Sequence, residues 1–184
     1  MGNKDPVIDT KLKAWVEKQP MFFVATAPLD ANGHVNCSPK GRDTLRVTGP
    51  REIVYLDMGG SGIETVAHLR ENQRIVIMLC AFQGPPRIMR FHGRGEPVLP
   101  GEARFDELRA QFPEPPSYPR SFIRVAVTRV ADSCGYGVPL MDYLAERRSI
   151  ENYVRDKTEA DLAAFRDEYN QASIDGLPGL ADTD

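Results

Sequence analysis

The most informative part of the sequence is the stretch Tyr55-Leu56-Asp57-Met58-Gly59-Gly60-Ser61-Gly62-Ile63-Glu64-Thr65-Val66. It reads as the end of a strand, a glycine-rich loop with two hydroxyl side chains nearby, and the first turn of a helix. The first N–H groups of a helix lack partners inside the helix, and the helix dipole favours an anion at that end. The stretch therefore predicts an anion site. The segments around it decide whether this site belongs to a parallel α/β domain or to an antiparallel barrel.

The segments before the loop are joined by tight turns. Residues 21–27 are apolar and β-branched, which predicts a buried strand, and Asp30-Ala31-Asn32-Gly33 follows with a strong hairpin signal. We expect the return strand over residues 34–38, with Pro39-Lys40-Gly41 ending it. Gly49-Pro50 marks another turn between strands at 45–47 and 52–57. Hairpins of this kind favour an antiparallel sheet, because parallel neighbours need long crossover connections.

The rest of the chain continues the pattern with about six strands in total. Further strands are expected at 74–82, 87–99 and 122–130, and helices at 63–72, 102–112, 147–153 and 158–169. The last helix begins with a capping-box-like pair, Thr158 and Asp161, and the tail after Asn170 is expected to be loose. The pattern predicts a mainly β (α+β) fold, an antiparallel barrel with N-terminal, internal and C-terminal helices. We expect one domain overall, with residues 1–20 as an N-terminal helix, 21–140 as the barrel and 141–184 as a C-terminal helical extension.

Composition limits the class of protein. The chain has 184 residues, 41% of them hydrophobic, with a formal net charge of −3. These values suit an ordinary globular protein and argue against nucleic-acid binding. No apolar run approaches the roughly 20 residues that span a bilayer, and the first residues lack the apolar region of a signal peptide. Three widely spaced cysteines argue against a disulfide framework and a zinc site. We therefore expect a cytoplasmic protein with no metal, no nucleic-acid partner and no membrane partner.

Two interpretations of the loop compete with a phosphate site in a barrel. Asp57-Met58-Gly59-Gly60-Ser61-Gly62 is similar to the glycine loop of S-adenosylmethionine-dependent methyltransferases. That fold needs an acidic residue at the end of the next strand to bind a ribose, but the strand here ends Cys80-Ala81-Phe82-Gln83. In the other interpretation the glycines serve only the turn, and Ser61 and Thr65 cap the helix.

Several stretches in a fixed order resemble one known family. The chain is similar to the pyridoxamine 5′-phosphate oxidase-like family of FMN-binding split β-barrels from Met21 to about Arg147. The resemblance rests on order and spacing rather than on any single motif. It implies a split β-barrel, FMN as the cofactor, and a homodimer with the flavin at the subunit interface. The stretches that carry it are Phe23-Val24-Ala25-Thr26-Ala27, Gly33-His34-Val35-Asn36-Cys37-Ser38-Pro39-Lys40-Gly41, Gly60-Ser61-Gly62-Ile63-Glu64-Thr65, Asn72-Gln73-Arg74-Ile75, Pro86-Arg87-Ile88-Met89-Arg90-Phe91-His92-Gly93 and Ser133-Cys134-Gly135-Tyr136-Gly137-Val138-Pro139.

The resemblance also implies a set of cofactor contacts. A flavin phosphate needs cations and N–H donors. The oxidase itself places an Arg-Lys pair in the loop, where this chain has Ile63 and Glu64, and a carboxylate at Glu64 would repel the phosphate unless it points away. We therefore expect the positive charge to come from Lys40 or from the strand of Arg87 and Arg90. The candidate cofactor-binding residues are Ser38 and Lys40 beside the cofactor; Ser61, Gly62 and Thr65 at the phosphate; Val35, Asn36 and Cys37 along the ring; Cys134 and Tyr136 closing over it; and Arg87 and Arg90.

The expected function is that of an FMN-dependent oxidoreductase acting on a small molecule, with NAD(P)H as a candidate electron donor and no catalytic side chain identified. Pyridoxamine 5′-phosphate itself is a weaker candidate substrate, because the sequence shows no pair of basic residues that would bind a second phosphate, the one on the substrate. One alternative is a non-catalytic flavin or haem binder, with His92 the best of three candidates for an axial ligand. The methyltransferase is the other alternative.

Overall fold

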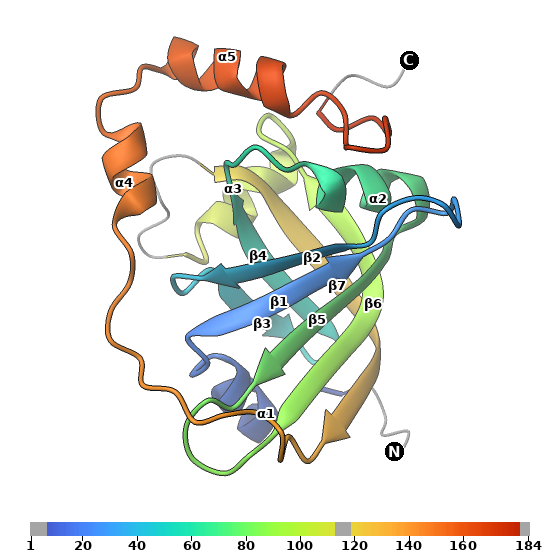
Figure 1. The fold of residues 1–184 in the computed structure, drawn as a ribbon, viewed down its shortest axis with the longest axis vertical. Coiled ribbons are helices and arrows are strands. Elements are labelled where there is room, and N and C mark those ends of the chain that lie inside the picture. The colour runs from blue at the N-terminus through green and yellow to red at the C-terminus, as the bar shows by residue number, and fades with distance from the viewer. Residues whose placement is uncertain (1–6, 113–118, 181–184) are drawn as a thin grey trace.

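The computed structural model describes residues 7–112 and 119–180, and in them seven antiparallel strands form one curved sheet (Figure 1). The strand order is β2-β1-β5-β6-β7-β4-β3, so β2 and β3 are the two edges of the sheet. The predicted antiparallel split barrel is confirmed, and each segment that was expected to form a strand contains one. The strands are β1 (Met21–Thr26), β2 (Asn36–Gly41), β3 (Leu45–Gly49), β4 (Glu52–Met58), β5 (Arg74–Cys80), β6 (Ile88–Val98) and β7 (Pro119–Ser133).

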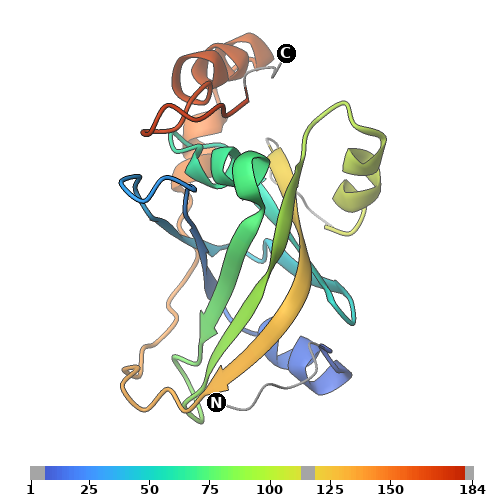
Figure 2. The same cartoon turned by 90° about the vertical axis from the view of Figure 1, so that its right-hand side faces the viewer.

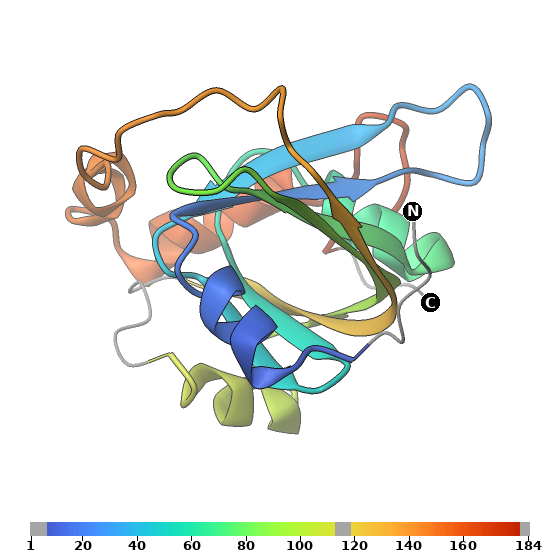
Figure 3. The same ribbon diagram turned by 90° about the horizontal axis from the view of Figure 1, so that it is seen from below.

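The sheet curls on itself, as the view from below shows (Figure 3). Apolar side chains pack together inside it and form the core. Strands β1 and β5 alternate between buried and partly exposed positions, which is the pattern of a sheet with one buried face. Strand β4 differs, because its consecutive residues from Ile53 to Asp57 are all buried. Its outer face carries Val54 and Leu56, which pack with Phe122 and with the helix over Ala103–Arg109. The end of β4 is therefore covered on both faces.

Helices lie at both ends of the barrel. Helix α1 (Thr10–Val16) packs against the core at the lower end, and α2 (Glu64–Asn72) lies at the upper end beside β6 and β1 (Figure 1). Helix α3 (Ala103–Arg109) covers the outer face of β4 and β7. The chain ends with α4 (Ser149–Val154) and α5 (Glu159–Tyr169). The predicted capping box of α5 is confirmed, because Thr158 and Asp161 bond each other's backbone N–H. No helix in the described ranges is long and apolar enough to cross a membrane.

Two expectations about the chain are wrong, and one alternative is excluded. Strand β2 does not end before Pro39 but runs on to Gly41, because an edge strand tolerates a proline that donates no ladder hydrogen bond. The all-antiparallel sheet also excludes the parallel fold of the methyltransferase. The segment after Asn170 is folded as far as Leu180, which packs against the core and donates a 2.8 Å hydrogen bond to the Asn170 carbonyl.

A long extended segment joins the barrel to the C-terminal helices. Residues 134–148, here called the strap, contain no helix or strand and run along the outside of the barrel to α4 (Figure 2). The strap exposes several large apolar side chains to solvent. They are Tyr136, Leu140, Met141, Tyr143 and Leu144, and Leu144 is 92% exposed.

Candidate functional site

The glycine loop lies between the buried end of β4 and the start of α2, and its carbonyl groups point toward two distant side chains. Arg120 Nη1 donates to the carbonyls of Gly60 at 3.0 Å and Gly62 at 2.7 Å. Asn170 Nδ2 donates to the carbonyls of Gly60 at 2.9 Å and Ser61 at 3.3 Å. The loop is therefore held from one side by the first residues of β7 and by the segment that follows α5.

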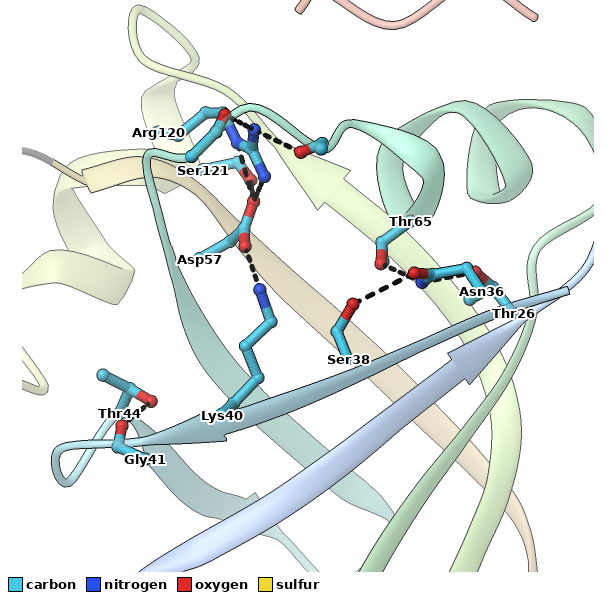
Figure 4. A network of polar contacts seen from close by, with 12 residues as sticks. Thr26, Asn36, Ser38, Lys40, Gly41, Thr44, Asp57, Thr65, Arg120 and Ser121 are labelled. Atoms are coloured by element: carbon cyan, nitrogen blue, oxygen red, sulfur yellow. Dashed lines mark hydrogen bonds and ion pairs between the residues drawn. The ribbon is translucent and has the colours of Figure 1, made fainter. Parts of the chain in front are cut away.

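Arg120 belongs to a buried charge network (Figure 4). Its guanidinium lies against Asp57 Oδ2, with Nε at 2.9 Å and Nη2 at 2.8 Å, while Lys40 Nζ lies 2.9 Å from Asp57 Oδ1. Burial raises the pKa of Asp57, but the attraction of Lys40 and Arg120 outweighs burial and holds this pKa below its usual range. The three groups together carry one net positive charge beside the loop.

The inward-facing residues of β2 form a row of hydrogen-bonding side chains. Asn36, Ser38 and Lys40 alternate along the strand and point toward the loop and the start of α2 (Figure 4). Ser38 Oγ donates to Asn36 Oδ1 at 3.0 Å, and Asn36 Nδ2 donates to Thr65 Oγ1 at 3.0 Å and Thr26 Oγ1 at 3.2 Å. Because Asn36 donates to Thr65, the Thr65 hydroxyl keeps its own hydrogen for another acceptor.

Two buried polar groups next to this row are incompletely bonded. His68 Nδ1 lies 2.9 Å from Thr26 Oγ1, and burial lowers the pKa of this histidine. Its Nε2 and the hydroxyl of Tyr55 are buried without a hydrogen-bond partner in the described ranges. Burial raises the pKa of Tyr55 well above its usual value. His68 and Tyr55 are therefore both neutral near pH 7.

The start of α2 offers backbone donors that have no partner inside the helix. Its N-cap residue, Ile63, makes no side-chain cap, and the first helical bond runs from the Ala67 N–H to the Ile63 carbonyl. The capping role considered for Ser61 and Thr65 is therefore wrong. Glu64 folds back over the loop, because a Cβ added at Gly62 would lie 2.8 Å from Glu64 Oε2. A carboxylate thus lies beside the N–H groups that would attract a bound anion.

The structure places the other predicted residues elsewhere. Val35 is 74% exposed and precedes β2, and Cys37 lies on the exposed face of that strand. Arg87, Arg90, Cys134 and Tyr136 all lie near the end of β7 that is opposite to Arg120. Arg87 pairs with Asp132 at 2.9 Å and lies over the Trp15 ring, while Arg90 donates to Ser133 Oγ at 3.2 Å.

A large cleft has two of the predicted cations in its wall, and the ammonium group of one of them, Lys40, is paired with Asp57. It has a volume of about 820 Å³ and lies between the strap and the outer side of α1, β1 and β2, with both Lys40 and Arg87 in its wall. The wall is largely apolar, with the rings or chains of Trp15, Met21, Phe82, Met141 and Tyr143. The volume lies within the range of about 300–1,000 Å³ that is typical of small-molecule sites.

Asp57, Arg120 and Asn170 belong to this site although no sequence motif predicts them there. Arg120 stands at the head of an apolar strand, where an arginine is ordinarily exposed, and Asn170 follows a helix at a position that predicts only its end. The position of Asp57 in the sequence predicts only the last residue of a strand. Nothing local distinguishes these residues, since each becomes part of the site through contacts 50 or more positions away in the chain.

Comparison with known proteins identifies similar chains. The family model described as pyridoxamine 5′-phosphate oxidase matches residues 8–134. The pyridoxamine 5′-phosphate oxidase family protein ustO of Aspergillus flavus is 33% identical over 191 residues, which cover 94% of this chain and 76% of that protein. The crystal structure of HupZ from Group A Streptococcus has a TM-score of 0.57 at 21% identity, covering 69% of this chain and 94% of that one. An FMN-binding protein from Syntrophomonas wolfei has a TM-score of 0.50 at 15% identity, covering 76% of this chain and 88% of that one.

Proposed function

Because the chain belongs to the pyridoxamine 5′-phosphate oxidase family, we propose that it binds FMN and is a flavin-dependent oxidoreductase acting on a small molecule. One observation carries the proposal. The row Asn36, Ser38 and Lys40 on β2 faces the first N–H groups of α2, which have no partner inside the helix, so hydroxyl, amide, ammonium and backbone donors lie beside one loop. Donors arranged in this way suit a phosphate monoester.

The residues present fit the two ends of an FMN molecule. The Thr65 hydroxyl, the Ser61 hydroxyl and the N–H groups of the loop would hold the phosphate, with Lys40 as the nearby cation. The exposed edge of β2 and the apolar cleft beside Lys40 offer a strand backbone and flat apolar walls for the ring. FMN ends in a single phosphate, which suits one loop of this kind. When bound, a flavin supplies hydride and one-electron chemistry, while the protein supplies binding, orientation and electrostatics.

We also propose that the working form is a homodimer. The strap exposes Tyr136, Leu140 and Leu144, and contiguous exposed apolar side chains mark interaction surfaces. The predicted residues Arg87, Arg90 and Tyr136 lie far from the glycine loop of their own chain. A second copy would bring such residues to the flavin from the other side of the interface.

Purified protein tests the cofactor. We expect a yellow preparation with a flavin absorbance spectrum that persists through gel filtration, and mass spectrometry should identify FMN. A colourless protein that takes up no added FMN would contradict the proposal, and a Soret band with an FMN-free protein would favour the haem binder instead. Stopped-flow reduction by NADH and NADPH then separates an enzyme from a carrier, because a carrier is reduced slowly or not at all by either donor.

A further inference from the structure

Three successive peptide groups of the glycine loop have the same orientation relative to Arg120 and Asn170. The carbonyls of Gly60, Ser61 and Gly62 all accept hydrogen bonds from these two side chains. The described chain contains no cis peptide bond, and in a planar trans peptide the N–H points opposite to the carbonyl. The N–H groups that follow these carbonyls therefore point away from Arg120 and Asn170. Successive N–H groups that share a direction can donate to the same anion.

The Arg120 side chain is held by Asp57 as well as by the loop. Its side chain is 4% exposed, and two of its nitrogens lie on one oxygen of Asp57, which is itself 1% exposed. The remaining nitrogen, Nη1, then donates to two loop carbonyls and to Asn170 Oδ1 at 3.2 Å. Binding the Asp57 carboxylate and the loop carbonyls at the same time needs a planar group with several donors in a fixed fork, which arginine has and lysine lacks.

Asn170 connects the C-terminal segment to the same glycine loop. It is fully buried, and its backbone is held by hydrogen bonds to Arg166 and Leu180, both 2.8 Å long. Gly179 lies so close to the Asn170 carbonyl and the Ile63 side chain that a Cβ there would overlap both. The segment from Asn170 to Leu180 is thus packed against the loop and the Ile63 side chain at the start of α2.

We infer that Arg120 and Asn170 are positioning residues for the phosphate of the cofactor, and that residues 170–180 form part of the cofactor site. This inference rests on the proposed function, since it concerns the same loop. Arg120 and Asn170 do not touch the phosphate. They hold the loop carbonyls pointing toward their own side chains, so that the loop N–H groups face the side on which Thr65 and Lys40 lie. Their effect is therefore specific to the phosphate end of the ligand.

A comparison of FMN with riboflavin measures that specificity, because the two ligands differ only in the phosphate. We expect the wild-type protein to bind FMN more tightly than riboflavin. In Arg120→Lys and in Asn170→Ala the ratio of the two affinities should fall by about tenfold or more, since two or more oriented donors are lost. Riboflavin affinity should change little. Arg124→Lys is the matched control, because Arg124 lies on the same strand but pairs with Glu52 and Glu96.

The outcomes separate the inference from the function on which it rests. An unchanged FMN to riboflavin ratio in folded Arg120→Lys and Asn170→Ala overturns the inference and leaves flavin binding intact. An equal loss of both ligands also overturns it, because that result indicates a structural role. A wild-type protein that binds neither ligand overturns the proposed function and the inference together. Thermal unfolding of each variant establishes that it is folded, and Asn170→Ala, which leaves the Asp57 pair intact, serves if Arg120→Lys does not fold.

Discussion

Lys40 Nζ lies 2.9 Å from Asp57 Oδ1, and this ion pair joins the edge strand β2 to the end of β4 across the open side of the sheet. Lys40 is 20% exposed, whereas Asp57 is 1% exposed and also pairs with Arg120. The carboxylate therefore depends on two cations, one from the edge strand β2 and the other from β7, the neighbour of β4 in the sheet. Lys40 is close enough to solvent to serve a bound anion as well.

The first prediction concerns the hydroxyl and the ammonium that the proposed phosphate site presents. Replacing Ser61 and Lys40 together with alanine should weaken FMN binding by about 2–4 kcal/mol, the scale of two charge-assisted hydrogen bonds. Isothermal titration calorimetry measures the affinity, and Lys11→Ala, an exposed lysine on α1, controls for the loss of charge. Unchanged affinity in the double variant would place the phosphate elsewhere.

The second prediction concerns the stability that Asp57 provides. Asp57→Asn leaves Arg120 buried without its anion, and breaking a buried pair costs about 3–5 kcal/mol of unfolding free energy. The folded-state pKa of Asp57 is depressed, so its contribution is present above the unfolded pKa of about 3.9 and is lost as pH falls through the folded pKa. Urea unfolding of the wild type should therefore weaken steeply below about pH 4.

The acid dependence of the Asp57→Asn variant should be shallower, because the amide does not titrate. Asp106→Asn, an exposed change in the first turn of α3, is the control and should leave the acid dependence as it is in the wild type. If Asp57→Asn and the wild type lose stability in parallel between about pH 5 and pH 2, the ion pair is not the source of the effect.

The third prediction concerns Glu64. Its carboxylate lies over Gly62, beside the N–H groups that would receive a phosphate, so like charges would repel each other there. Glu64→Gln should strengthen FMN binding by about three- to tenfold at low salt, and the gain should shrink as salt screens the repulsion. Glu107→Gln on α3 is the control. A weaker affinity for FMN in Glu64→Gln would show that the carboxylate helps to order the loop instead.

The fourth prediction concerns the strap. Leu144→Asp places a charge on a side chain that is 92% exposed in the single chain, and it should shift the proposed homodimer toward monomer. Sedimentation velocity measures the shift, and FMN affinity should fall with it if the partner completes the site. Leu29→Asp, which alters an exposed leucine outside the strap, should leave the dimer intact. A wild-type chain that sediments as a monomer at micromolar concentration would exclude the dimer.

Short-range patterns predicted most of the elements. The apolar run of β1 and the Asn32-Gly33 turn gave a hairpin that the structure contains, and Thr158 with Asp161 marked the start of α5 correctly. These signals succeed because strand alternation, turn chemistry and helix capping each depend on a few neighbouring residues. The extension of β2 through Pro39 was missed, since a proline is read as a break unless the strand is known to be an edge.

Local sequence patterns are sufficient to predict the antiparallel barrel, and they also predict an anion site at the glycine loop. Which side chains hold that loop depends on the tertiary structure. Asp57, Arg120 and Asn170 meet because closure of the sheet places β7 beside β4, and because the C-terminal segment folds back onto α2. Contacts between residues so far apart depend on the order of the strands and on which chain ends pack together, and no local pattern records either.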